Sequence, residues 1–200
     1  MSGLSTVLFD FGGVVIRTPF ELLDTDWQGP FDPSLDPLWR AFQAGDMTER
    51  EYWHTRARQR HPDADEPVGA FMRTLYDTDE AVIVRPEIPV LLDELEGHGL
   101  HVAVLTNDLA AFHSDEWIDR MTVIRRFDPV IDLSHVGFLK PSTEAFAHAC
   151  KLLDTDAGEV VFVDDQPANI AGARAYGLTA VWFDPTDIDG SIAQVLAAGR

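Results

Sequence analysis

The chain has 200 residues, 46% of them hydrophobic, and a net charge of −19 at pH 7. This length supports one hydrophobic core with at most a small appended lobe. A surface this acidic repels phosphate backbones and anionic lipids, so we expect no nucleic-acid and no membrane partner. The single cysteine, Cys150, cannot form an internal disulfide, and the N-terminus lacks a basic and apolar leader. We therefore expect a cytoplasmic protein.

Five short apolar runs predict β-strands, at residues 5–10, 100–106, 127–134, 159–165 and 178–184. The second, fourth and fifth are rich in valine and nearly continuous in apolar residues, as in strands covered on both faces of a parallel sheet. Amphipathic segments such as 142–153 and 167–177 lie between them. Strands that alternate with helices predict right-handed βαβ units and a doubly wound, Rossmann-like α/β core.

The segment from residue 17 to residue 84 breaks this alternation. Its apolar runs are helical in character, and Thr48 with Glu51 predicts a capping box ahead of one of them. We therefore expect a small all-helical cap at 17–84, inserted after the first strand. The α/β core would then consist of residues 1–16 and 85–200.

Polar side chains stand where the predicted strands end. Asp10 ends the first strand, and Asp164 and Asp165 end the fourth. The second strand ends in Thr106, Asn107 and Asp108. The carboxyl ends of such strands line one crevice, so these residues should meet in space. Clustered carboxylates repel one another, and a hard cation such as Mg²⁺ relieves that repulsion while leaving positions for phosphate oxygens. The pattern predicts a Mg²⁺ site that also holds a phosphate.

Lys140 precedes a helix that begins near Ser142, beside the same crevice. A lysine there can place its positive charge on a phosphate, and Thr106 can add a hydroxyl. Each of these residues alone has a commonplace explanation as a cap, a turn or a surface residue. Together, in this order at strand ends, they point to one site.

These stretches resemble the four motifs of the haloacid dehalogenase superfamily. They read "FDFGGVV" around Asp10, "LTN" at Thr106, "KP" at Lys140 and "VFVDDQPANIAGARAYG" with Asp164 and Asp165. The resemblance extends over nearly the whole chain, and the helical insert resembles the C1-type cap of subfamily I. Within the superfamily, the sequence looks most like the sugar-phosphate phosphatases and the phosphatase domain of soluble epoxide hydrolase.

The resemblance implies a Mg²⁺-dependent phosphatase that acts on a small phosphorylated metabolite, such as a sugar phosphate. Asp10 would be the nucleophile and would form an aspartyl-phosphate. Asp10, the backbone carbonyl of Gly12 and Asp165 would hold Mg²⁺, with Asp164 in support.

Three further residues take roles by the same resemblance. Thr106, Asn107 and Lys140 would bind the transferring phosphoryl group, and Thr106 and Lys140 would take part in catalysis. The partner is then a small-molecule phosphate ester, and the chain is a monomer or a homodimer.

Gly12 departs from the family pattern, because most family phosphatases carry a second aspartate there as the general acid. A glycine side chain cannot donate a proton, and general acid catalysis typically contributes about 10²–10⁴-fold. Three possibilities stay open: the leaving group needs no acid, a cap residue or water supplies the proton, or the enzyme is slow.

Two other function classes compete with the phosphatase. A 2-haloacid dehalogenase needs neither a metal nor an acid at Gly12, but it has no use for the pair Asp164–Asp165. A non-catalytic binding protein would not need all the motifs. The acidic pair favours the phosphatase.

Residues of the cap and several histidines are further candidates. Aromatic residues at these spacings more often pack a core than contact substrate, and the candidate cap contacts are Phe20, Trp27, Trp39, Trp53 and His54. The histidines proposed as the missing acid are His54, His113 and His135. Cys150 lies on an apolar helix stripe and is expected in the core.

Overall fold

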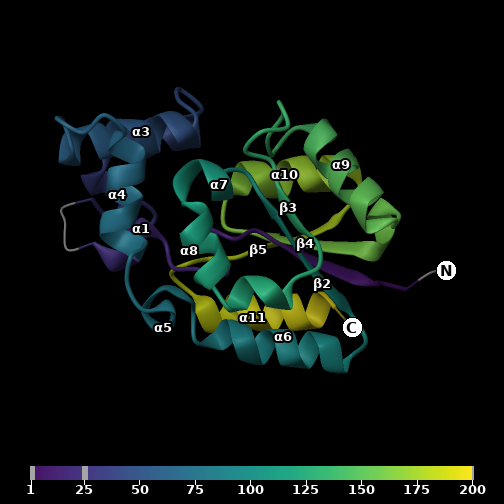
Figure 1. Ribbon diagram of the computed structural model, residues 1–200. Coiled ribbons are helices and arrows are strands. Elements are labelled where there is room, and N and C mark those ends of the chain that lie inside the picture. Colours follow the sequence, from purple (N-terminus) through teal and green to yellow (C-terminus); the bar gives the residue numbers. More distant parts are fainter. Residues whose placement is uncertain (1–2, 24–26, 200) are drawn as a thin grey trace.

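The computed structural model describes residues 3–23 and 27–199. Its core is a five-stranded sheet with the order β3-β2-β1-β4-β5, and every strand pair is parallel (Figure 1). The strands are β1 (Thr6–Phe9), β2 (His101–Thr106), β3 (Val130–Asp132), β4 (Val160–Asp164) and β5 (Thr179–Trp182). This sheet confirms the predicted α/β fold, and each observed strand lies within its predicted run.

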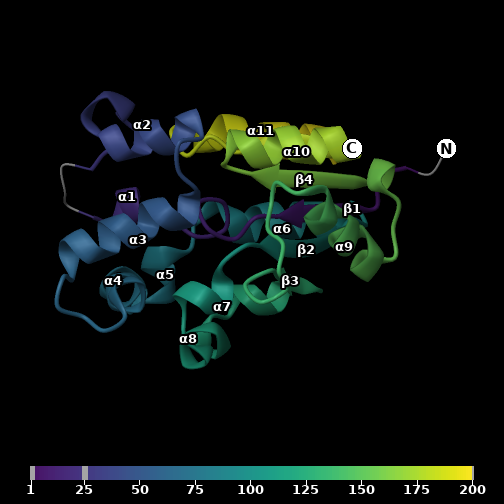
Figure 2. The ribbon, with the colours of Figure 1, turned by 90° about the horizontal axis from the view of Figure 1, so that it is seen from above.

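Helices cover both faces of the sheet. α6 (Glu87–Gly97) and α11 (Ile188–Ala198) lie on one face, and α9 (Thr143–Leu153) and α10 (Pro167–Tyr176) lie on the other (Figures 1 and 2). Successive residues of β1 serve both layers: Phe9 packs in the hydrophobic cluster of the first face and Leu8 in that of the second. Burial on both faces explains why the strands are nearly continuous in apolar residues.

Short helices connect β2 to β3, and a 3₁₀ turn connects α9 to β4. They are α7 (Leu109–Phe112), α8 (Asp115–Arg120) and the 3₁₀ turns η2 (Val123–Arg126) and η3 (Ala157–Glu159). Cys150 of α9 is buried, as expected. None of the helices in the described ranges combines the length and the apolar character needed to cross a membrane.

The insert after β1 is helical, as predicted, and lies beyond the carboxyl ends of the strands (Figure 1). Its helices are α1 (Pro19–Leu22), α2 (Pro37–Ala44), α3 (Glu49–Arg60), α4 (Pro67–Tyr76) and α5 (Glu80–Ile83), with the 3₁₀ turn η1 (Pro33–Leu35) before α2. Thr48 and Glu51 form the expected capping box at the start of α3. The boundaries of the cap at residues 17 and 84 stay a prediction.

The two segments that connect the core to the cap, near residues 16–17 and 83–85, contact each other. The backbone of Arg17 donates to Ile83 O at 2.9 Å, beside a bridge between Ile16 and Val84. The buried Arg85 guanidinium forms an ion pair with Glu21 at 2.6 Å and donates to Gly13 O at 2.9 Å. Arg85 therefore joins the first helix of the insert to the glycine loop that follows β1.

Candidate active site

Three acidic residues meet at the carboxyl ends of β1 and β4. One carboxylate oxygen from each of Asp10, Asp164 and Asp165 lies within 4.8 Å of the others. They come together because adjacent parallel strands end at the same edge of the sheet. The expected clustering of these residues is therefore observed.

Lys140 lies inside this acidic cluster rather than at its rim. Its Nζ is 2.9 Å from Asp10 Oδ1 and 2.7 Å from Asp164 Oδ2, and its side chain is almost fully buried. Asn169 Nδ2 donates to Asp164 at 3.0 Å, and the Gln166 amide donates to it at 2.8 Å. Asp164 is thus saturated by protein donors, whereas Asp10 keeps an oxygen for other partners.

Asn107 holds Lys140 in place. The Asn107 side chain accepts from the Lys140 amide at 2.8 Å and donates to the Lys140 carbonyl at 3.2 Å. Thr106 is buried at the end of β2 and lines the same pocket. Thr106, Asn107 and Lys140 therefore lie next to Asp10, while the Asn107 side chain is engaged by the backbone of Lys140.

The site carries more negative than positive charge. Burial raises the pKa of Asp10 to about 7, with Lys140 opposing and Asp164 adding to the rise. Burial and the charges of Asp164 and Asp10 also raise the pKa of Asp165 well above its usual range. A single lysine leaves these carboxylates undercompensated, which is the electrostatic condition that a bound divalent cation relieves.

The two glycines after Asp10 differ in what surrounds them. Gly13 has φ +78°, and an ideal Cβ there would lie 2.7 Å from Asp165 Cγ. A Cβ built on Gly12 would meet no heavy atom within 4 Å. Packing therefore requires glycine at position 13, whereas the missing acid at Gly12 leaves open space.

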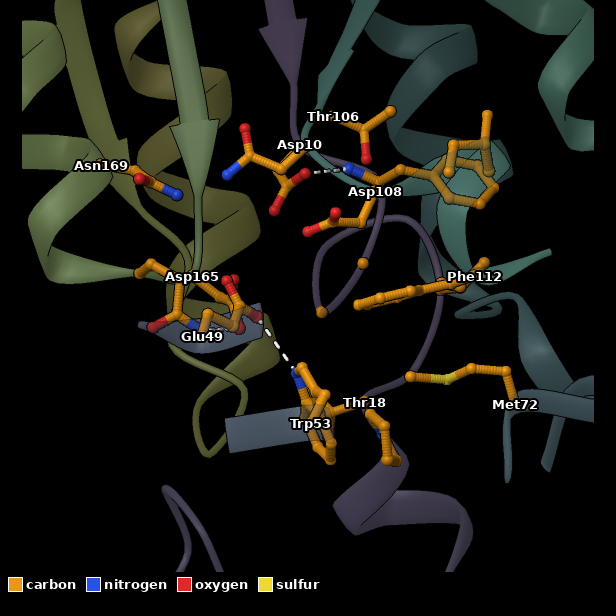
Figure 3. A pocket seen from close by; sticks show the side chains of 18 of the residues that line it. Asp10, Thr18, Glu49, Trp53, Met72, Thr106, Asp108, Phe112, Asp165 and Asn169 are labelled. Atoms are coloured by element: carbon orange, nitrogen blue, oxygen red, sulfur yellow. Dashed lines mark hydrogen bonds between the residues drawn. The ribbon is translucent and has the colours of Figure 1, made fainter. Parts of the chain in front are cut away.

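A pocket opens from the acidic cluster toward the cap (Figure 3). Core residues line one end, and residues from the insert line the other. Among the expected cap contacts, Phe20, Trp39 and Trp53 line it. They also pack edge-on or tilted against one another, so they serve both the cap core and the pocket wall. His54 is exposed and, like Trp27, does not line the described pocket.

A family model for haloacid dehalogenase-like hydrolases matches residues 4–177. This chain belongs to the haloacid dehalogenase-like hydrolases. Such an assignment agrees with the fold and with the chemistry of the residues at the strand ends.

Several known proteins are similar to this chain over most of its length. Sesquiterpene phosphatase astK of Aspergillus oryzae is 29% identical over 190 residues, 87% of each chain. Ribulose-1,5-bisphosphate 5-phosphatase of Halopiger xanaduensis is 30% identical over 70% of this chain, which covers 59% of that protein. The magnesium-bound HAD-hydrolase YfnB of Bacillus subtilis shares the fold with a TM-score of 0.66 at 22% identity, over 90% of this chain and 87% of that one. A haloacid dehalogenase also occurs among the relatives.

Glu49 is a pocket residue of this hydrolase that sequence reasoning missed. It is the first residue of α3, lies near Asp165 in Figure 3, and accepts from Trp53 Nε1 at 3.3 Å. Burial and the charges of Asp10 and Asp108 raise its pKa to about 8. The sequence signal was its spacing of four residues before Trp53, which places both on one helix face.

Two further polar residues line the pocket near α7. Asp108, which follows the second predicted strand, forms an ion pair with Arg50 of α3. His113 stacks on Trp117 with ring centroids 3.9 Å apart, and burial lowers its pKa to about 4. His113 is therefore neutral at neutral pH and is a poor proton donor. His135, the third histidine candidate, is exposed and does not line this pocket.

Proposed function

We propose that this hydrolase is a phosphatase that transfers the phosphoryl group of a small phosphate monoester to Asp10 and then to water. The observation that carries the proposal is Asp10 at the end of β1, with the Lys140 ammonium 2.9 Å away and two further carboxylates beside it. Relatives named as phosphatases support the same reaction class. These relatives are named for different substrates, so their names do not identify the substrate of this chain.

The chain's own residues account for the covalent steps. A carboxylate oxygen of Asp10 attacks phosphorus and the bond from phosphorus to the ester oxygen breaks, which forms an aspartyl-phosphate and an alkoxide. The alkoxide takes a proton from water or from a cap residue such as Glu49 and leaves as the alcohol. Water then hydrolyses the acyl phosphate and restores Asp10. Lys140 would neutralise charge on the transferring group, and the Thr106 hydroxyl and the Asn107 backbone amide would donate to its oxygens.

The donor set fits Mg²⁺, which prefers carboxylate and carbonyl oxygens. Asp10, Asp165 and the Gly12 backbone carbonyl would hold it, with Asp164 in support. When bound, the ion would neutralise and orient the phosphoryl oxygens. The close approach of Gly13 to Asp165 places that carboxylate against the loop that carries the Gly12 carbonyl.

The test is turnover of phosphate esters by the wild-type protein and two variants. With Mg²⁺ present, Asp10→Asn should abolish turnover, because an amide cannot form the acyl phosphate. The matched control Asp63→Asn, an exposed site in the insert, should keep it. Full activity in Asp10→Asn, or in EDTA, would overturn the proposal.

A haloacid dehalogenase is the second candidate, because the absence of an acid at Gly12 suits both reactions. The Asp164–Asp165 pair favours the phosphatase, since a metal-free dehalogenase does not need two acids beside an anionic nucleophile. Halide release from 2-chloropropionate, in the absence of ester turnover, would reverse this order.

A further inference from the structure

Six large apolar side chains line the pocket that contains Asp10. We call this surface the apolar wall, and its residues are Ile16, Phe20, Trp39, Trp53, Met72 and Phe112. Trp53, Met72 and Phe112 lie across the open space from Asp10 (Figure 3). In the proposed reaction, the leaving group of the ester would occupy this space.

Positive charge is scarce in this pocket. Among the described lining residues, Lys140 is the only lysine or arginine, and it is engaged by Asp10 and Asp164. Glu49 and Asp108 line the same pocket, where Asp108 is paired with Arg50 and Glu49 accepts from Trp53 Nε1. A second anionic group on the substrate, whether phosphate or carboxylate, would therefore find no unpaired lysine or arginine in the described lining.

Hydrogen-bonding groups along the cap side are already used within the protein. Thr18 Oγ1 donates to Glu21 at 2.9 Å, and the Tyr76 hydroxyl donates to Arg17 O at 2.9 Å. In the described part of the wall, Trp39 Nε1 is the one buried donor without a partner. A leaving group with several hydroxyls would exchange its water contacts for few protein partners, chiefly the carboxyl groups of Glu49 and Asp108.

We propose that the substrate is a phosphate monoester of an uncharged, apolar alcohol whose carbon skeleton packs against the apolar wall. This inference rests on the proposed phosphatase function and narrows its substrate class. It disfavours the sugar phosphates expected from the sequence. Burial of the carbon skeleton would supply the binding energy that charge pairing supplies for anionic substrates.

The experiment compares n-alkyl phosphates from ethyl to decyl. Their alcohols have nearly equal acidity, so the series changes apolar area without changing the chemistry. We expect kcat/KM to rise by about two- to fourfold per methylene until the wall is covered. Size-matched polar partners, glycerol 1-phosphate against propyl phosphate and phosphoglycolate against ethyl phosphate, should be turned over at least about tenfold less efficiently. Equal or better turnover of the polar partners would overturn the inference.

A charge placed in the wall gives an independent test. Phe112→Lys should lower kcat/KM for decyl phosphate and raise it for phosphoglycolate. The same change at the exposed Val90 of α6, Val90→Lys, should leave the ratio of kcat/KM for decyl phosphate to kcat/KM for phosphoglycolate unchanged. An unchanged ratio in folded Phe112→Lys would count against the wall as the leaving-group site.

A binding measurement separates this inference from the proposed function. Asp10→Asn protein is titrated with decylphosphonate and with phosphonoacetate, and the intrinsic tryptophan fluorescence, to which Trp39 and Trp53 of the pocket contribute, is followed. Tighter binding of decylphosphonate supports the apolar wall, and tighter binding of phosphonoacetate overturns it. If no ester is turned over by the wild-type protein, the phosphatase proposal fails, and the binding order still decides the apolar preference.

Discussion

Gly13 lies so close to Asp165 that an ideal Cβ on the glycine would be 2.7 Å from the carboxylate carbon. The loop after β1 therefore packs directly against the acid that follows β4. The neighbouring Gly12 has open space at the corresponding position. One glycine is required by packing and by its φ of +78°, while the other determines chemistry through the acid that it lacks.

Gly13→Ala should lower the free energy of unfolding by about 2–4 kcal/mol, from left-handed backbone strain and the clash with Asp165. Gly12→Ala is the matched control and should stay within about 1 kcal/mol of wild type. Urea unfolding measures both. Equal losses in the two variants would contradict the close approach.

Gly12→Asp should supply a proton donor in the open space next to Asp10. We expect turnover of alkyl phosphates to rise by up to about 10²-fold, and turnover of 4-nitrophenyl phosphate, whose leaving group needs no proton, to change little. Gly12→Asn has the same size and donates no acidic proton. A gain in Gly12→Asn equal to that in Gly12→Asp would show that the effect is not acid catalysis.

Glu49→Gln should slow turnover of alkyl phosphates by about tenfold or more and that of 4-nitrophenyl phosphate much less. The reason is that Glu49 would donate the proton that an alkyl leaving group needs. It is the only carboxyl group that the described part of the insert adds to the pocket lining. Glu51→Gln, an exposed position on the same helix, is the control and should keep both rates. Equal slowing of both esters in Glu49→Gln would assign Glu49 a structural role instead.

The metal-free protein should lose stability as the pH rises. The pKa values of Asp10 and Glu49 increase on folding, to about 7 and about 8, so the folded state favours their protonated forms. Their contribution is full below the unfolded pKa values near 4 and is lost as the pH passes through about 7–8. In EDTA we expect a loss of about 2–4 kcal/mol between pH 5 and pH 8.5.

Two comparisons assign this pH dependence to the site. Glu49→Gln should flatten the upper part of the curve, above about pH 7, since one titrating group is removed. Added Mg²⁺ should reduce the loss by binding the deprotonated carboxylates. Stability that increases from pH 5 to pH 8.5 in EDTA would contradict the raised pKa values.

Much of the core and of the acidic cluster could be predicted from the sequence. The apolar runs that end in Asp10, Thr106 and Asp164 define parallel strands, and parallel strands carry their last residues to one edge of the sheet. The same rule brings Lys140 near them, because it precedes the helix that leads into β4. What the sequence did not show is that Lys140 bridges Asp10 and Asp164 and that Asn107 holds it there.

The sequence by itself determined the fold class, the helical insert and the identity of the residues at the strand ends. Periodicity reports which face of an element is buried, and strand order follows from short-range connections. Only the tertiary structure decided that Glu49 and the apolar wall face the acidic cluster. That arrangement depends on how the insert packs over the sheet, through contacts such as the ion pair of Arg85 with Glu21. These contacts join segments that are far apart in the sequence, and the hydrophobic pattern of one segment does not specify its contacts with another.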